Sequence, residues 1–261
     1  MPETKPFVRI AAVGDLHYGK TSQGSLQFLT TALSAADADV LLLCGDLTDY
    51  GMPEEARNLA KELVSGVKIP IIGVLGNHDY ESGAAVEVVA ALREASVTIL
   101  DGDSAEIRGV GFAGVKGFAG GFGRGVLGPW GEEATKRFVH EAVNETLKLE
   151  SALARLRTAT RVAVLHYAPV QGTVEGEPRE IYPYLGCSRL EEPLVRYAVS
   201  YVFHGHAHNG ALEGRTTGNA PVYNVSLPLL RKLTPDQPFR IVDAPVSTAS
   251  VSSSSSSSSS S

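Results

Sequence analysis

Short apolar runs alternate with helical segments through the first part of the chain, and this rhythm constrains the fold more than any other feature. The runs 7–13, 40–43 and 69–75 are rich in Val, Ile and Leu, as expected for parallel strands covered on both faces. Segments with helical character follow them at residues 25–35, 53–64 and 84–95. Right-handed crossovers place the carboxyl ends of such strands along one edge. We therefore predict an α/β fold in which the residues after each strand converge.

The remainder of the chain predicts further strands and one long loop. Strands are expected at 97–100, 161–165, 199–203, 222–227 and 239–242, with a β-rich, glycine-rich stretch to about residue 128 and a long helix at 132–157. Residues 168–187 are rich in Pro and Gly and are typical of a long loop that could fold over a site. We predict one domain over residues 1–246 and a disordered Ser-rich tail at 247–261.

Side chains of Asp, Asn and His occur wherever a predicted strand ends. The motifs are Asp15-Leu16-His17, Gly45-Asp46-Leu47-Thr48-Asp49, Gly76-Asn77-His78-Asp79, the isolated His166, and His204-Gly205-His206-Ala207-His208. Imidazole nitrogen and carboxylate oxygen together suit Zn, Mn, Fe or Ni ions, and strand ends are where an α/β protein places its site. In an extended segment, residues two apart point the same way, so Asp15 with His17 and His206 with His208 can each direct two ligands into one site. The sequence therefore predicts a dinuclear metal centre.

Taken in order, these five motifs resemble those of the calcineurin-like metallophosphoesterase family, over about residues 10 to 210. The resemblance implies a four-layer α/β/β/α sandwich with two mixed β-sheets. It also implies two divalent or trivalent metal ions, from among Mn, Fe, Zn and Ni. One ion would be held by Asp15, His17, Asp46 and His208, and the other by Asp46, Asn77, His166 and His206, with Asp46 as the bridge.

The same resemblance implies a mechanism. A metal-bridging hydroxide would attack phosphorus, and His78 would protonate the leaving oxygen or stabilise its charge. Asp79 is expected to orient His78 by accepting a hydrogen bond. The chain has a net charge of −6, which disfavours a large nucleic-acid footprint, but two ions, two carboxylates and one hydroxide would leave about +1 at the site for a phosphate.

The resemblance implies that the substrate is a small phosphodiester or phosphomonoester, and we favour the diester. Their forms resemble the bacterial cyclic-nucleotide phosphodiesterase branch of the family. A phosphoprotein phosphatase is an alternative, although that branch is expected to have Arg where this chain has Tyr50 and Glu where it has Asp79. A catalytically inactive scaffold on the same fold is a second alternative, and the presence of all seven ligand positions and of His78 argues against it.

Several other residues have open or ordinary interpretations. His204 is expected to support the ligands or to be structural, and His140 to be exposed on the long helix. Asp49 either hydrogen-bonds near the ligands or forms a turn. Residues 116–130 are expected to form a flexible loop near the substrate, with Lys116 or Arg124 as phosphate contacts. The N-terminal residues resemble neither a signal peptide nor a membrane span, so we expect a cytoplasmic protein without a membrane partner, and the oligomeric state stays open.

Overall fold

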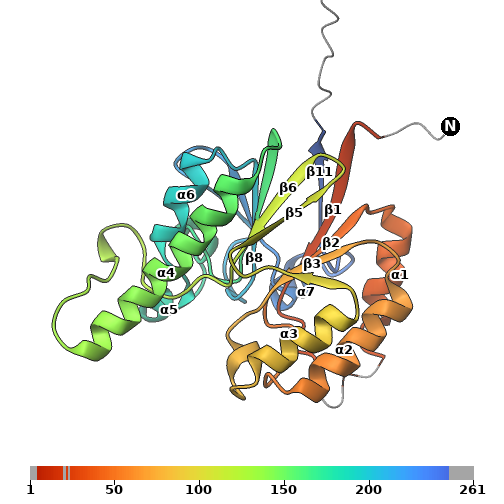
Figure 1. Cartoon of the computed structure of the whole chain (residues 1–261), viewed down its shortest axis with the longest axis horizontal. Coiled ribbons are helices and arrows are strands. Elements are labelled where there is room, and N and C mark those ends of the chain that lie inside the picture. The colour runs from red at the N-terminus through yellow and green to blue at the C-terminus, as the bar shows by residue number, and fades with distance from the viewer. Residues whose placement is uncertain (1–4, 20–21, 23, 247–261) are drawn as a thin grey trace, which may run out of the picture.

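The N-terminal half of the chain forms most of a five-stranded mixed sheet (Figure 1). The computed structural model describes residues 5–19, 22 and 24–246. The sheet order is β11-β1-β2-β3-β4. The parallel strands are β1 (Phe7–Val13), β2 (Val40–Cys44), β3 (Ile71–Val74) and β4 (Val97–Ile99), and β11 (Arg240–Pro245) runs antiparallel to β1. Three helices lie along its outer face: α1 (Gln27–Ala36), α2 (Pro53–Gly66) and α3 (Ala85–Glu94).

A second, six-stranded sheet is formed by the middle and C-terminal parts of the chain, in the order β5-β6-β7-β8-β10-β9. Its strands are β5 (Asp103–Ile107), β6 (Val110–Gly114), β7 (Thr160–Val164), β8 (Tyr201–His204), β9 (Glu213–Arg215) and β10 (Pro221–Asn224). The strands β6, β7, β8 and β10 are parallel, whereas β5 and β9 pair antiparallel at the two edges. The long helix α4 (Glu133–Arg155) and the short α6 (Glu191–Arg196) cover this sheet.

The two sheets share one apolar core. In β7, Val162 and Val164 belong to the same buried cluster as the strands of the first sheet, whereas Ala163 packs with Leu149 and Leu153 of α4. This alternation is the period of two expected of a strand that is covered on both faces. The predicted four-layer α/β/β/α sandwich with two mixed β-sheets is therefore confirmed.

Local sequence signals explain how α2 begins. Pro53 opens its first turn, where a missing N–H has no effect on helix hydrogen bonding. The buried Glu55 carboxylate accepts hydrogen bonds from the backbone N–H groups of Tyr50 (3.0 Å) and Met52 (3.2 Å), which are free donors at a helix start. Leu59 and Leu63 are then buried against the sheet. The hydrogen bonds of Glu55 therefore hold in place the segment that directly follows the Asp46 motif.

Some elements differ from the sequence predictions. The predicted strand at 222–227 ends at Asn224, and a helix not predicted, α7 (Leu227–Leu233), begins where Ser226 turns the chain and Pro228 takes a first-turn position. Strand β9 and helix α6 were also not predicted. The loop at 168–187 contains the short helix α5 (Tyr182–Leu185). The predicted disordered tail lies outside the described residues.

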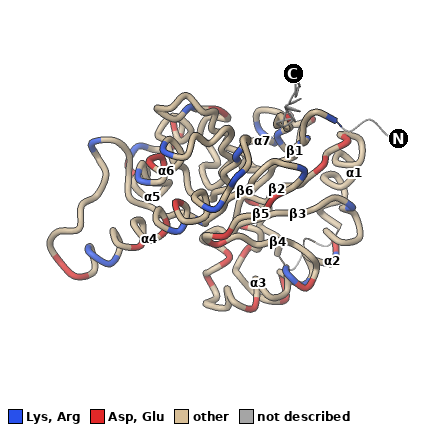
Figure 2. Tube along the Cα trace, turned by 45° about the horizontal axis from the view of Figure 1, so that its top comes forward, with Lys and Arg blue, Asp and Glu red and all other residues tan. Residues whose placement is uncertain are grey.

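Charged residues of both signs are spread over the described part of the chain, as Figure 2 shows. Within the described part of the chain, none of the helices combines the length and apolar character that crossing a bilayer requires.

Candidate metal centre

The ends of five strands bring the predicted ligands to one place. Ligand atoms of Asp15, His17 and His208 all lie within 4.8 Å of one another, and so do those of Asp46, His166 and His206. The seventh predicted ligand, Asn77, has its Oδ1 2.9 Å from His166 Nε2. The seven predicted ligands therefore lie together, and the ligand atoms of a third set, His17, Asp49 and His78, are also within 4.8 Å of one another.

Asp46 lies between the two groups. Its Oδ1 is 3.4 Å from Nε2 of His166, and its Oδ2 is 3.9 Å from Nε2 of His17. Each oxygen of this buried carboxylate therefore faces a different group, which is the arrangement required of a bridging ligand.

The backbone at these ligands is unusual. Asp15 (φ 57°), His17 (φ 45°), Asp46 (φ 48°) and His206 (φ 70°) all adopt left-handed conformations. The expectation that the ligand pairs lie in extended segments was therefore wrong, since tight turns aim these side chains instead. Non-glycine residues rarely adopt positive φ, and such outliers concentrate at functional sites.

His166 is arranged as an electron-pair donor. Its Nδ1 donates a hydrogen bond to the Cys44 carbonyl oxygen at 3.0 Å, which leaves Nε2 without a proton in the neutral ring. Burial lowers the pKa of His166 well below its usual value, so the ring is neutral. Its Nε2 then faces the Asn77 and Asp46 oxygens with no proton between them. A cation satisfies such a set of converging lone pairs.

His206 and His17 fit a metal for related reasons. The Nε2 of His206 donates to the Tyr184 carbonyl oxygen at 3.1 Å, which leaves Nδ1 as the free lone pair, and burial lowers the pKa of His206 to about 3. Among the described residues, the buried Nε2 of His17 has no hydrogen-bond partner. An orphaned buried nitrogen is costly unless it binds a ligand, and here it points toward Asp46.

Asp15 is a desolvated carboxylate. Burial raises its pKa to about 6, although a hydrogen bond from His208 Nε2 at 3.0 Å acts in the opposite direction. The backbone N–H of His206 also donates to both Asp15 oxygens at 3.0 Å. Asp15 therefore joins the end of β1 to the turn after β8, and a nearby cation would offset its desolvation cost.

His78 lies at the half-exposed edge of this centre. Its backbone N–H donates to Asp46 Oδ1 at 2.9 Å, and its Nδ1 donates to the Asp49 carbonyl oxygen at 2.8 Å. Burial alone would lower the pKa of His78, but this carbonyl and the charges of Asp46, Glu81 and Asp49 raise it overall. A protonated ring beside a phosphate is suited to general-acid catalysis.

Asp79 has partners other than the predicted one. Its buried carboxylate accepts hydrogen bonds from the backbone N–H groups of Leu47 (3.1 Å), Thr48 (2.8 Å) and Gly76 (2.8 Å), and from the Thr48 hydroxyl (2.6 Å). Burial raises its pKa to about 6, while the bonds from Gly76 and Thr48 lower it. None of the hydrogen bonds found in the described residues joins it to His78. Asp79 therefore links the loops after β2 and β3.

The other histidines and Asp49 are also placed. His204 is buried and bonds the Thr173 hydroxyl and the Gly205 carbonyl oxygen, both at 2.8 Å, outside the two ligand groups. His140 is exposed, as predicted. Asp49 lies within the site, with Oδ1 3.8 Å from His17 Nδ1.

Sequence reasoning missed the backbone carbonyls that orient the ligands, those of Cys44, Asp49 and Tyr184. No side-chain pattern could have revealed them, because every residue carries a carbonyl. The loop containing Tyr184 does contact the site, as its composition suggested.

The segment after β6 is irregular and its first part is mostly buried. Residues 117 and 119–122 are buried, and Lys116 is half-buried. Its ammonium lies over the rings of Phe118 (4.8 Å to the centroid), Tyr167 (5.4 Å) and Tyr80 (5.6 Å). Arg124 is exposed.

Residues 8–210 match the profile of the Calcineurin-like phosphoesterase family. The chain belongs to this family, and the family implies a metal-dependent phosphoester hydrolase. No curated protein matches the chain.

Solved structures show the same fold at low sequence identity. The protein TT1561 of Thermus thermophilus is 13% identical with a TM-score of 0.53, over 92% of this chain and 100% of that one. A Staphylococcus aureus protein is 16% identical with a TM-score of 0.54. It is named as a candidate 5′-nucleotidase and was solved in complex with alpha-ketoglutarate. That match covers 93% of this chain and only 55% of the larger protein.

Proposed function

We propose that the protein hydrolyses a small phosphodiester at a dinuclear metal centre. The observation that carries this proposal is the position of Asp46, whose two oxygens face two separate groups of ligand atoms. One ion would be held by Asp15, His17, Asp46 and His208, and the other by Asp46, Asn77, His166 and His206. Two such ions, when bound, supply a nucleophile derived from water near neutral pH and positive charge for the phosphoryl oxygens.

The chain's own residues then prepare the leaving group. The Asp49 carbonyl fixes the His78 ring through Nδ1, so Nε2 is the nitrogen that can deliver a proton to the leaving oxygen. The backbone bond from His78 to Asp46 holds this acid at a fixed distance from the bridging carboxylate. Asp79 acts in this proposal by positioning the two loops that carry Asp46 and His78.

Hydrolysis assays test the proposal. Bis(p-nitrophenyl) phosphate and p-nitrophenyl phosphate are compared after loading with Mn, Fe, Zn or Ni, with 3′,5′-cyclic AMP and a nucleoside 5′-monophosphate as further substrates. We expect metal-dependent hydrolysis, with the diester faster than the monoester. Faster hydrolysis of the monoester would show that the predicted preference for a diester is wrong. Hydrolysis of neither substrate with any of the four metals would favour a catalytically inactive scaffold.

A further inference from the structure

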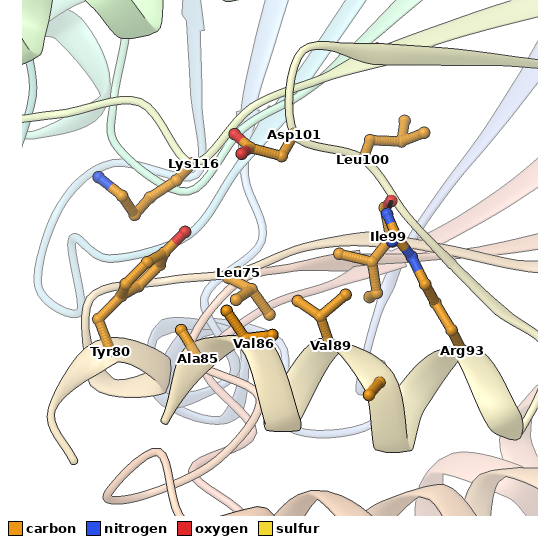
Figure 3. A pocket seen from close by; sticks show the side chains of 11 residues that line it. Leu75, Tyr80, Ala85, Val86, Val89, Arg93, Ile99, Leu100, Asp101 and Lys116 are labelled. Carbon is orange, nitrogen blue, oxygen red and sulfur yellow. Dashed lines mark hydrogen bonds between the residues drawn. The ribbon is translucent and has the colours of Figure 1, made fainter. Parts of the chain in front are cut away.

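A predominantly apolar pocket of about 520 Å³ lies between helix α3 and the ends of strands β3 and β4 (Figure 3). Helix α3 contributes Val86 and Val89 to it, and the strands β3 and β4 contribute Leu75 and Ile99 at or just beyond their ends. Tyr80 and Lys116 lie at one end of the pocket and Arg93 at the other. Pockets of this size take small organic ligands.

The same chain segments carry residues of the pocket lining and ligands of the site. Leu75 and Tyr80 flank the Asn77-His78 motif on either side. The Lys116 carbonyl oxygen accepts hydrogen bonds from the backbone N–H groups of His166 and Tyr167, both at 3.0 Å. The Tyr167 ring in turn lies 4.5 Å from the ring of His206. The end of the pocket formed by Tyr80 and Lys116 is therefore the end that is linked to the predicted ligands, and a substrate with its phosphate at the metals would extend into the pocket from there.

Three charged side chains of the pocket lining already have a partner within the chain. Arg93 donates to the Ile99 carbonyl oxygen at 3.1 Å, and Asp101 pairs with Lys148 at 2.9 Å. The Lys116 ammonium donates to the Gly117 carbonyl oxygen at 2.7 Å. Most of the lining is apolar, so aliphatic carbon would be buried against Val89 and Leu75, whereas a nucleobase would leave much of its polar edge facing apolar side chains.

We infer that this pocket binds an apolar organic group of the substrate, which makes the substrate a phosphoester of a lipophilic alcohol. The inference rests on the proposed function, because it places the phosphate at the metal centre. It distinguishes a lipophilic ester from the nucleotide that the motif forms alone would favour.

A chain-length series tests the inference on the manganese-loaded protein. The substrates are p-nitrophenyl diesters that carry a methyl, butyl or octyl group. Each buried methylene strengthens binding by roughly three- to fourfold, so we expect kcat/KM to rise at least tenfold from methyl to butyl. A flat series, or a p-nitrophenyl thymidine 5′-ester that is turned over faster than the butyl ester, would overturn the inference.

Substitutions in the pocket test whether the dependence on alkyl chain length arises there. Val89→Gln should remove most of the chain-length gain, and Val86→Gln, at a position 80% exposed and so tolerant of a polar residue, should reduce it. The matched control is Val64→Gln on α2, a 49% exposed valine outside the pocket lining. Retention of the full gain in both pocket variants, or an equal loss in the control, would show that the alkyl chain binds elsewhere.

A binding measurement separates this inference from the proposed function. Octylphosphonate and methylphosphonate have a carbon–phosphorus bond that ester hydrolysis does not cleave, so calorimetry measures binding alone. We expect octylphosphonate to bind at least tenfold more tightly, with the difference lost in Val89→Gln. If that holds while no phosphoester is hydrolysed, the pocket inference stands and the proposed function fails. If esters are hydrolysed without any chain-length effect, the reverse is true.

Discussion

Gly76 tests whether the site depends on close packing of the backbone around Asp46. A Cβ at residue 76 would collide with Oδ1 and with the backbone nitrogen of Asp46, and would lie 2.8 Å from its Cγ. Rotation of the Asp46 side chain cannot relieve the contact with the backbone nitrogen, so one of the two loops must shift. We therefore expect Gly76→Ala to displace the carboxylate that faces both ligand groups.

The cost of this substitution can be estimated from packing. Inserting a methyl group into a filled site costs about 1–3 kcal/mol, and the loops absorb this as lower folding stability or as weaker metal binding. If this cost falls on folding stability, it lowers the melting temperature by roughly 2–4 °C per kcal/mol in a chain of this size. If the same cost falls on metal binding, it weakens metal affinity about 5- to 150-fold, because 1.4 kcal/mol corresponds to a factor of ten. Both ions should weaken together, since Asp46 faces both groups.

Two measurements cover both outcomes: thermal unfolding of the metal-free protein and calorimetric titration with Mn²⁺. Gly125→Ala is the matched control, because among the described residues no atom lies within 4 Å of the Cβ it would add. If Gly76→Ala keeps the wild-type melting temperature and the wild-type affinity for both ions, close packing around Asp46 is not required and the reasoning is refuted.

Three further substitutions probe separate parts of the site. Asp46→Asn removes the shared charge and should weaken both ions at least tenfold, as measured by elemental analysis after dialysis; two tightly retained metals would contradict the bridging role. His78→Ala should lower kcat at least a hundredfold with metal content nearly intact, and more for alkoxide than for nitrophenolate leaving groups; an equal loss for both would remove its role as the acid. Thr48→Val removes the buried hydroxyl that donates to Asp79 and should cost about 1–2 kcal/mol in urea unfolding, so unchanged stability would show that this bond contributes little.

The sequence predicted the strands of the first sheet well because its apolar runs are continuous. In β2 all five residues from Val40 to Cys44 are buried, and a buried parallel strand needs no polar face. The convergence of the ligands followed from the same reasoning, since parallel strands end at one edge. The order of the strands therefore predicted that these side chains lie close together, although not how each one is oriented.

The geometry itself was not predictable, because it depends on the backbone. Asp15, His17, Asp46 and His206 adopt left-handed conformations, and although Asp and His are among the non-glycine residues enriched there, most of them still have negative φ, so the residue types alone do not predict these turns. The partners of Asp79 are mainly backbone N–H groups, two of them in the loop after β2, more than 30 residues away, and one at the nearby Gly76. A sequence motif indicates which side chains lie together, but not the backbone hydrogen bonds that orient them.

Burial gives the centre a further property that can be tested. It raises the pKa of Asp15 to about 6 and lowers the pKa of His206 to about 3, so burial makes an isolated carboxylate costly and keeps the ring neutral. Both effects favour a cation over a proton, because a neutral ring offers its lone pair and a desolvated carboxylate gains most from a nearby positive charge. Binding should therefore stabilise the fold by about 2.7 kcal/mol for each site at a free Mn²⁺ concentration of one hundred times its Kd. A melting temperature that does not rise as Mn²⁺ is added would show that these groups do not form a metal site, whatever the protein hydrolyses.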